Sequence, residues 1–218
     1  IAERDGNFVA PSDMLVGHWL LYFLSTYKKG SVRESTYERY LQLAAKIEPI
    51  SRIPLQSCTV SQVQELLNSL TPDGSRKVHV LLHAAFQQAV DLSVIQKNII
   101  RLTRAKKIIR EEPSIFNKEE IKKLLSYAKD KMPIFYPIFL LVAHTGMRRG
   151  EILGLRWKDA NLKNNTVTIR QQLQRVGSEI IFQPPKTKSG KRKISIPTVV
   201  TNALQELRDD EKTIDIKQ

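Results

Sequence analysis

Arg148 and Glu151 are the residues whose types and spacing point most directly to chemistry. They lie three residues apart, just after a Thr-Gly-Met segment, where a helix is expected to begin. A guanidinium carries a permanent charge and can give two parallel hydrogen bonds to an anion. A carboxylate one helical turn later can accept hydrogen bonds and orient that guanidinium. The pair therefore predicts a binding site for an anionic group.

A second group of basic residues surrounds the Ser189-Gly190 turn. Its members are Lys186, Lys188, Lys191, Arg192 and Lys193. An ammonium on a flexible stem can donate a proton to a departing oxygen, which is the task of a general acid. The same side chains could instead contact nucleic-acid phosphates without any chemical role. Residue type alone leaves both interpretations of this turn open.

The overall charge favours a polyanionic partner. Lys and Arg total 35 against 22 acidic residues, which gives a net charge of +13 at pH 7 and a pI near 9.9. An excess of this size is typical of proteins that bind nucleic acid. A generally basic protein without such a partner is the alternative.

Composition also argues against several other classes of protein. No apolar run approaches the roughly 20 residues of a membrane span, and no signal peptide is recognised, so a cytoplasmic protein is expected. The single Cys58 excludes an internal disulfide framework and a multi-cysteine zinc site, and is expected to be a small buried residue. His79 and His83 have ligand-like spacing but no matching third residue, so neither a metal nor another cofactor is expected.

Residues 1–100 predict a helical bundle. Apolar residues recur at helical spacing within 12–28, and Gly30 is expected to end that helix. The clearest apolar stripe lies within 78–90, where apolar residues follow the i, i+3, i+4, i+7 pattern. The sequence thus indicates several amphipathic helices that share one core.

Turn and capping signals divide this helical region. Ser35 with Glu38, and Thr59 with Gln62, have the spacing of capping boxes, which mark the first turn of a helix. The Pro-Asp-Gly segment at 72–74 predicts a turn before the clearest helix.

Residues 101–113 predict a basic interdomain linker that ends at Pro113. Arg104, Lys106 and Lys107 lie within it and are expected to contact the DNA backbone. A solvated helix end is the alternative for an isolated basic run.

Residues 114–218 predict a mostly helical α+β domain with a small antiparallel sheet. Asn117 with Glu120 is expected to cap a first helix, and a second helix should cover 133–144. The expected strands, joined in one sheet, are 166–169, 180–182 and 192–196. A further helix at 199–207 and a polar tail at 209–218 complete the predicted elements.

The segment from Thr145 to Asp159 resembles the first catalytic box of the tyrosine recombinase, or phage integrase, family. The family pattern is T-G-x-R-x-x-E-[IL]-x-x-L-x-W-x-D, and TGMRRGEILGLRWKD fits it at every defined position. The segment KTKSGKRK at 186–193 is similar to the family's lysine-bearing β-hairpin. More weakly, the first hundred residues, with Lys28-Lys29-Gly30, Ser35-Thr36-Tyr37, Tyr40 and a helix expected to end in Asn98, are similar to the family's core-binding domain.

This resemblance implies roles for individual residues. Arg148 would bind the phosphate that gains charge under attack, with Glu151 orienting it. Lys188 is preferred as the general acid because it directly precedes the Ser-Gly turn, with Lys186 and Lys191 as rivals. The remaining basic residues near the site, Arg149, Arg192 and Lys193 together with those two rivals, would contact DNA.

The resemblance also implies the function of the complete enzyme. Such an enzyme breaks and rejoins DNA strands through a 3′-phosphotyrosine, without metal or nucleotide. A helical core-binding domain (1–100) and a catalytic domain (from 114) form a C-shaped clamp on duplex DNA. Tetramers on two DNA sites, in the cytoplasm at the bacterial nucleoid, insert or excise a phage genome or mobile element.

The sequence departs from the family pattern downstream. The family has a His-x-x-Arg box, a further His or Trp, and the nucleophilic Tyr, but no histidine follows His144 and no tyrosine follows Tyr136. We therefore expect residues 1–218 to bind DNA and to carry only part of the catalytic domain, so that they are inert alone. A non-catalytic DNA-binding protein that occupies recombination sites or regulates transcription is the alternative, and a type IB topoisomerase is a further rival.

Overall fold

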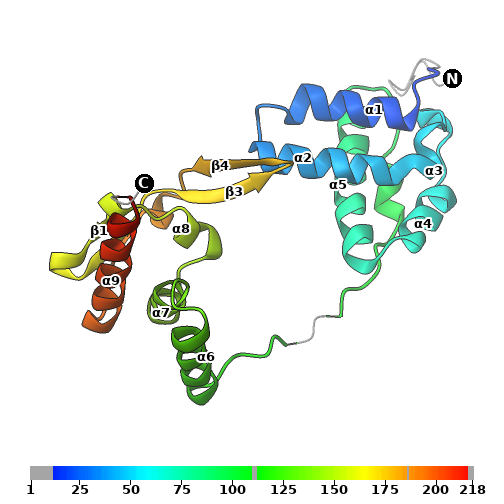
Figure 1. The fold of residues 1–218 in the computed structure, drawn as a ribbon. Coiled ribbons are helices and arrows are strands. Elements are labelled where there is room, and N and C mark those ends of the chain that lie inside the picture. The colour runs from blue at the N-terminus through cyan, green and yellow to red at the C-terminus, as the bar shows by residue number, and fades with distance from the viewer. Residues whose placement is uncertain (1–11, 110–111, 186, 216–218) are drawn as a thin grey trace, which may run out of the picture. The chain divides into compact units, whose positions relative to one another are not determined.

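The computed structural model describes residues 12–109, 112–185 and 187–215; of Lys188 and of 211–215 it describes the backbone alone. The chain divides into two compact units, Ile1–Glu111 and Glu112–Gln218 (Figure 1). The predicted fold class is confirmed, because helices dominate and the second unit adds small antiparallel sheets. Within the described ranges, none of the helices combines the length and the apolar character that a membrane-crossing segment requires.

The first unit is a bundle of helices around one apolar core. Its elements are α1 (Val16–Phe23), which continues into a π-helical turn (Leu24–Lys28), α2 (Glu34–Ala44), α3 (Glu48–Ser51), α4 (Val60–Ser69) and α5 (Pro72–Asp91), with 3-10 turns at Ala45–Ile47, Leu55–Ser57 and Ile99–Leu102. Val78, Leu82 and Phe86 of α5 are buried at its centre, as the apolar stripe predicts. Trp19 of α1 packs there too, and its indole N–H donates to the Ala85 carbonyl at 2.8 Å.

One of the two predicted capping boxes in this unit forms. The Thr59 side chain accepts from the Gln62 amide, and the Gln62 side chain accepts from the Thr59 amide, so the box at the start of α4 is confirmed. The box predicted at Ser35 is wrong, because α2 already begins at Glu34 and Arg33 occupies its N-cap position. Since Ser35 lies inside the first turn, its side chain is not placed to cap that turn.

The longest helix of the bundle is shifted relative to its prediction. The turn predicted at 72–74 is wrong: Thr71 caps α5, and the proline fits its first turn, where an amide hydrogen has no intrahelical acceptor. The helix ends at Asp91 and does not reach Asn98. Asn98 instead caps the 3-10 turn at Ile99–Leu102 by accepting from the Ile100 amide at 3.1 Å.

The first part of the predicted linker packs on the helical bundle. The amide of Arg104 donates to the Gln64 side chain at 2.9 Å, and the Arg104 carbonyl accepts from that side chain at 3.0 Å. The amide of Lys106 donates to Ser75 Oγ at 3.1 Å. The side chains of Arg104, Lys106 and Lys107 are exposed, so this segment presents cations along a backbone that the bundle holds.

The second unit packs helices against a small sheet. Its elements are α6 (Lys118–Lys131), α7 (Tyr136–Thr145), α8 (Arg149–Leu153), β1 (Ala160–Asn161), β2 (Thr166–Ile169), β3 (Gln172–Val176), β4 (Glu179–Gln183), β5 (Arg192–Ser195) and α9 (Thr198–Asp215), with 3-10 turns at Trp157–Asp159, Leu162–Asn164 and Lys188–Gly190. The core joins Leu141 of α7, Val167 and Ile169 of β2, and Val200 of α9. The predicted capping box of Asn117 and Glu120 is confirmed at the start of α6.

The strands form two separate sheets and not the single sheet predicted. β2 is the central strand of an antiparallel β1-β2-β5 sheet. The strand predicted at 180–182 is part of β4, which pairs only with β3 in a two-stranded ribbon (Figure 1). β3 was not predicted, because its side chains are mostly half-buried and polar and show no alternation. The helix predicted at 199–207 is longer than predicted, since α9 continues to Asp215, into the predicted polar tail.

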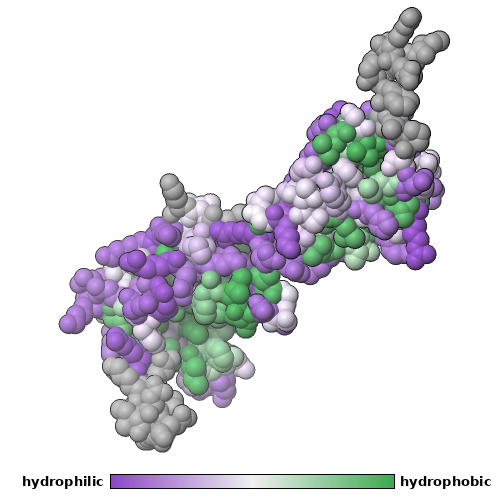
Figure 2. All heavy atoms as spheres, turned by 90° about the horizontal axis from the view of Figure 1, so that it is seen from above, coloured by the Kyte–Doolittle hydropathy of each residue, from purple (hydrophilic) through white to green (hydrophobic). Residues whose placement is uncertain are grey.

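Apolar side chains remain exposed on the second unit, beside a largely hydrophilic surface (Figure 2). Ile134, Phe135 and Leu153 are each at least half exposed. These three side chains therefore lie outside the described core of this unit.

Cys58 provides a test of the core of the first unit. Burial raises the pKa of its thiol to about 11, and the side chain is only 7% exposed. Because the thiolate is the reactive form, we expect Cys58 in the folded chain to react with a disulfide reagent at pH 8 at least about 100-fold more slowly than in the urea-unfolded chain. Equal labelling rates in the two states would contradict the described packing.

Candidate active site

Arg148 reaches the surface from a turn fixed at both ends by buried residues. Gly146 ends α7 with φ of +60°, a conformation that favours glycine. Met147 then enters the core at 4% exposure, and Arg148 follows in extended conformation as the N-cap residue of α8. The Arg148 side chain is 77% exposed, whereas Glu151, one turn later, is 2% exposed. The turn thus presents a guanidinium above a buried carboxylate.

Two arginines together surround the Glu151 carboxylate. Arg148 donates to Oε2 from its backbone amide at 2.9 Å and to Oε1 from Nη1 at 3.1 Å. Arg192 of β5 donates to Oε1 from Nη1 at 3.1 Å and to Oε2 from Nη2 at 3.0 Å. Four hydrogen bonds match the acceptor capacity of an ionised carboxylate. The sequence prediction that Glu151 orients Arg148 is consistent with this geometry, which also includes a partner that sequence reasoning did not identify.

The pKa of Glu151 reflects opposing effects. Burial of the carboxyl raises its pKa, but the hydrogen bonds from Arg192 and then from the Arg148 amide and guanidinium lower it, and the pKa lies below its ordinary value. Glu151 is therefore ionised at neutral pH. Two guanidinium charges and one carboxylate leave this cluster with a net positive charge, which suits an anionic ligand.

Arg192 lies on the opposite side of β5 from Lys193. Successive residues of a strand point to opposite faces, and Arg192 and Ile194 are half-buried whereas Lys193 and Ser195 are exposed. Arg192 and Lys193 are both predicted DNA contacts. The alternation of side chains along a strand could have separated these two residues and placed Arg192 on the core side of the sheet. A DNA contact by either residue remains a prediction, and the Arg192 guanidinium already binds Glu151.

The basic turn that precedes β5 is organised by its small residues. The Thr187 and Ser189 hydroxyls lie 3.0 Å apart, and the amide of Gly190 donates to the Thr187 carbonyl at 3.0 Å. Lys188 lies in this 3-10 turn, Lys191 is exposed beside it, and Lys186 lies outside the described residues. Because β5 starts two residues after the turn and Arg192 binds Glu151, the lysine turn is tied to the Arg148 site through the chain.

Two glycines let the β3–β4 ribbon approach α8. A Cβ built on Gly150 would lie 2.8 Å from the Leu173 carbonyl oxygen, and one on Gly154 would lie 2.8 Å from Gln172 Cα. Neither contact tolerates a side chain, since both partners are backbone atoms of β3. Backbone packing therefore fixes the ribbon against the helix that carries Glu151.

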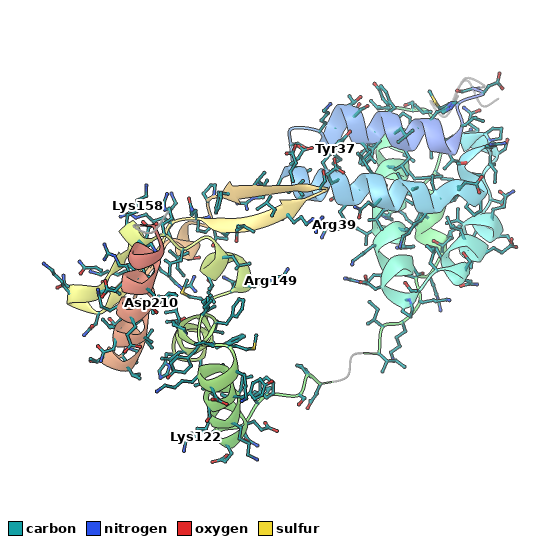
Figure 3. The ribbon with its side chains drawn as sticks, viewed as in Figure 1. Tyr37, Arg39, Lys122, Arg149, Lys158 and Asp210 are labelled. Carbon is teal, nitrogen blue, oxygen red and sulfur yellow. The ribbon has the colours of Figure 1, made fainter. Side chains whose placement is uncertain are left out.

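Leu155, Trp157 and Asp159, which are further defined positions of the box pattern, have packing roles. Asp159 is buried and binds Arg156 Nε at 2.6 Å and Arg170 Nε at 3.2 Å, which joins the turn after α8 to the end of β2. Leu155 and Trp157 pack against the core of the unit. Arg149, beside Arg148, is exposed in the second unit (Figure 3), so a DNA contact remains a prediction for it.

Comparison with known proteins agrees with the box. Residues 114–215 match the phage integrase family. Over an alignment 238 positions long, the chain is 27% identical to a tyrosine recombinase XerC-like protein of Caldanaerobacter subterraneus subsp. tengcongensis, and the alignment covers 98% of this chain and 60% of that protein. The chain thus spans less than two thirds of this relative.

Two solved structures share the fold. The Tn1549 transposon integrase in complex with a circular intermediate DNA is 24% identical, with a TM-score of 0.74 over 88% of this chain and 64% of that chain. A lambda integrase tetramer bound to a Holliday junction is 18% identical, with a TM-score of 0.66 over 88% of this chain and 56% of that chain. Both similarities concern the arrangement of the elements.

Glu151→Gln tests the electrostatics of the site. Since the folded pKa is lowered, the ionised carboxylate stabilises the fold above the unfolded pKa of about 4.3, and this contribution is lost as pH falls through the folded value. We expect the variant to be less stable by about 3 kcal/mol at pH 7 and to show a weaker loss of stability below pH ~4. Urea unfolding at several pH values measures the stability difference and its pH dependence. Parallel pH profiles of stability for the two proteins would contradict a lowered pKa of Glu151.

Gly154→Ala tests the packing of the ribbon. The added methyl group meets the β3 backbone, so either α8 or β3 must shift, at a cost of about 1–3 kcal/mol. Thermal unfolding and amide chemical shifts of 172–176 measure the effect. An unchanged melting temperature with unchanged β3 shifts would show that the ribbon does not lie where it is described.

Proposed function

Since the chain belongs to the phage integrase family of tyrosine recombinases, we propose that it is the DNA-binding and partly catalytic portion of a site-specific recombinase. The complete enzyme cleaves and rejoins DNA through a 3′-phosphotyrosine, and thereby integrates or excises a phage genome or mobile element. The observation that carries this proposal is the Arg148–Glu151–Arg192 cluster, which presents an exposed, oriented guanidinium and in which Arg192 follows the lysine-rich turn along the chain.

The geometry suits stabilisation of charge on a phosphodiester. Attack on phosphorus increases the negative charge on the non-bridging oxygens, and the exposed guanidinium of Arg148 can bind two of them with parallel hydrogen bonds. Glu151 orients Arg148 through their ion pair. The site keeps a net positive charge, because Arg192 adds a second guanidinium.

A lysine of the basic turn supplies the proton for the leaving 5′ oxygen in this proposal. Lys188 remains preferred, and Lys186 and Lys191 remain rivals. An ammonium is a suitable general acid because its stem is flexible and its proton can move to an alkoxide as the P–O bond breaks. Replacing each lysine in turn by alanine, with substrates that carry a better leaving group at the 5′ position, would identify the donor by rescue.

DNA binding involves both units in this proposal. The helical unit acts as a core-binding domain, and Arg104, Lys106 and Lys107 contact phosphates from the backbone segment that the bundle holds. Duplex DNA is the partner, and the complete enzyme assembles as a tetramer on two sites at the bacterial nucleoid. The DNA-bound Tn1549 and lambda integrases of similar fold support the partner, and the lambda tetramer supports the assembly.

The nucleophile lies outside residues 1–218 in this proposal. No tyrosine follows Tyr136, and no histidine follows His144. Residues 1–218 are therefore expected to bind DNA without cutting it, because the electrostatic stabilisation of Arg148 has no attacking group to assist.

Covalent trapping tests the proposal. The full-length protein should form a denaturant-stable adduct with a nicked duplex that carries the element's recombination site, residues 1–218 alone should form none, and Arg148→Gln should reduce the adduct rate about 100- to 1,000-fold. Lys163→Gln, which removes an exposed charge from the turn after β1, is the control.

The outcomes separate the rival functions. DNA binding by the full-length protein without an adduct would overturn the proposal in favour of a non-catalytic DNA-binding protein. Adduct formation on any duplex, without preference for the recombination site, would indicate a type IB topoisomerase.

A further inference from the structure

Arg192 hydrogen-bonds to both carboxylate oxygens of Glu151, which could otherwise accept further hydrogen bonds from the Arg148 guanidinium. Its two terminal nitrogens contact both carboxylate oxygens, at 3.1 and 3.0 Å. Arg148 contributes a single guanidinium nitrogen, Nη1, to the same carboxylate. Among the described residues, Glu151 is the one side chain recorded as a partner of the Arg148 guanidinium, so its remaining N–H groups can bind another anion.

The two arginines differ in anchoring and in exposure. Arg192 is 33% exposed and comes from β5, paired with β2 opposite the buried Ile169. Arg148 is 77% exposed and comes from the same short turn as Glu151. Arg192 is therefore the fixed partner, and Arg148 is the one free to engage a ligand.

We propose that Arg192 is a positioning residue that keeps Arg148 available for the DNA phosphate, by occupying both oxygens of Glu151. Without Arg192, Arg148 would turn its guanidinium onto the buried carboxylate and form a two-pronged ion pair with it. That pair would remove both the charge and the free N–H groups of Arg148 from the ligand. The inference rests on the proposed function for the identity of the anion, but the competition for Glu151 is a property of the folded chain alone.

A direct phosphate contact by Arg192 is the competing explanation. It predicts that the effects of losing Arg192 and Arg148 on DNA affinity are independent, because each residue would bind its own phosphate. Positioning predicts that the two losses overlap, because Arg192 acts through Arg148. Non-additivity in a double-mutant cycle distinguishes the two explanations.

The experiment measures binding of residues 1–218 to a short mixed-sequence duplex by fluorescence anisotropy. The variants are Arg148→Gln, Arg192→Gln and the double variant, with Arg175→Gln, at the exposed position of β3, as the charge-matched control. We expect each single site variant to weaken binding about 10-fold and the double variant to be within about 2-fold of Arg148→Gln. A double variant weaker by about 100-fold would overturn positioning and favour an independent contact.

An NMR measurement tests the same inference without DNA. The side-chain N–H signals of Arg148, assigned by their loss in Arg148→Gln, should shift in Arg192→Gln and stay in place in Arg175→Gln. Unchanged Arg148 signals would overturn the inference, whereas absent DNA binding with shifted signals would overturn the proposed function alone. If Arg192→Gln does not fold, Arg192→Lys serves instead: it keeps the charge but gives Glu151 one contact in place of two, and an intermediate Arg148 shift is expected.

Discussion

A buried carboxylate, that of Glu151, holds the second unit together at its candidate site. Ionised carboxylates are costly to bury, and the cost is offset only when their acceptor sites are filled by well-placed cations. Glu151 meets this condition with two arginines, one of which lies three residues before it and the other 41 residues after it. The interaction therefore links the turn after α7 to the strand β5, and neither segment can move without leaving a charge unpaired. The rigidity of the candidate site follows from this single constraint.

Local sequence signals identified what lies close together along the chain. The capping boxes at Thr59 and Asn117, the core stripe of α5 and the pairing of Arg148 with Glu151 all involve residues within a turn or two of each other. The box pattern identified Arg148 correctly as an exposed arginine at a helix start. Such features depend on the repeat of a helix or strand, which can be read from the spacing of residues in the sequence.

The features that sequence missed depend on distant partners. The strand β3 has no apolar alternation of its own, because its position is set by β4 and by the close approach of Gly150 and Gly154. Arg192 could be identified as a partner of Glu151 only from its strand face together with the knowledge that β5 starts beside α8. Ser35 shows the opposite failure, because a suitable local pattern was present but the helix began two residues earlier than predicted, with Arg33 as its N-cap residue. Register and tertiary pairing decided these cases.

A second carboxylate in the same unit explains why paired arginines alone do not make a site. Asp159 is buried and binds Arg156 and Arg170, much as Glu151 binds its two arginines. Both of these contacts use Nε, and no basic turn precedes Arg170 as the Lys188–Gly190 turn precedes Arg192. Arg170 is also exposed, at 66%, and binds Asp159 through one nitrogen, so exposure alone does not distinguish the two carboxylates. At Glu151, Arg192 contacts both carboxylate oxygens with its two terminal nitrogens and follows the lysine turn along the chain, whereas Arg148 contributes one guanidinium nitrogen. It is this unequal sharing of one carboxylate that turns a structural ion pair into a candidate phosphate clamp.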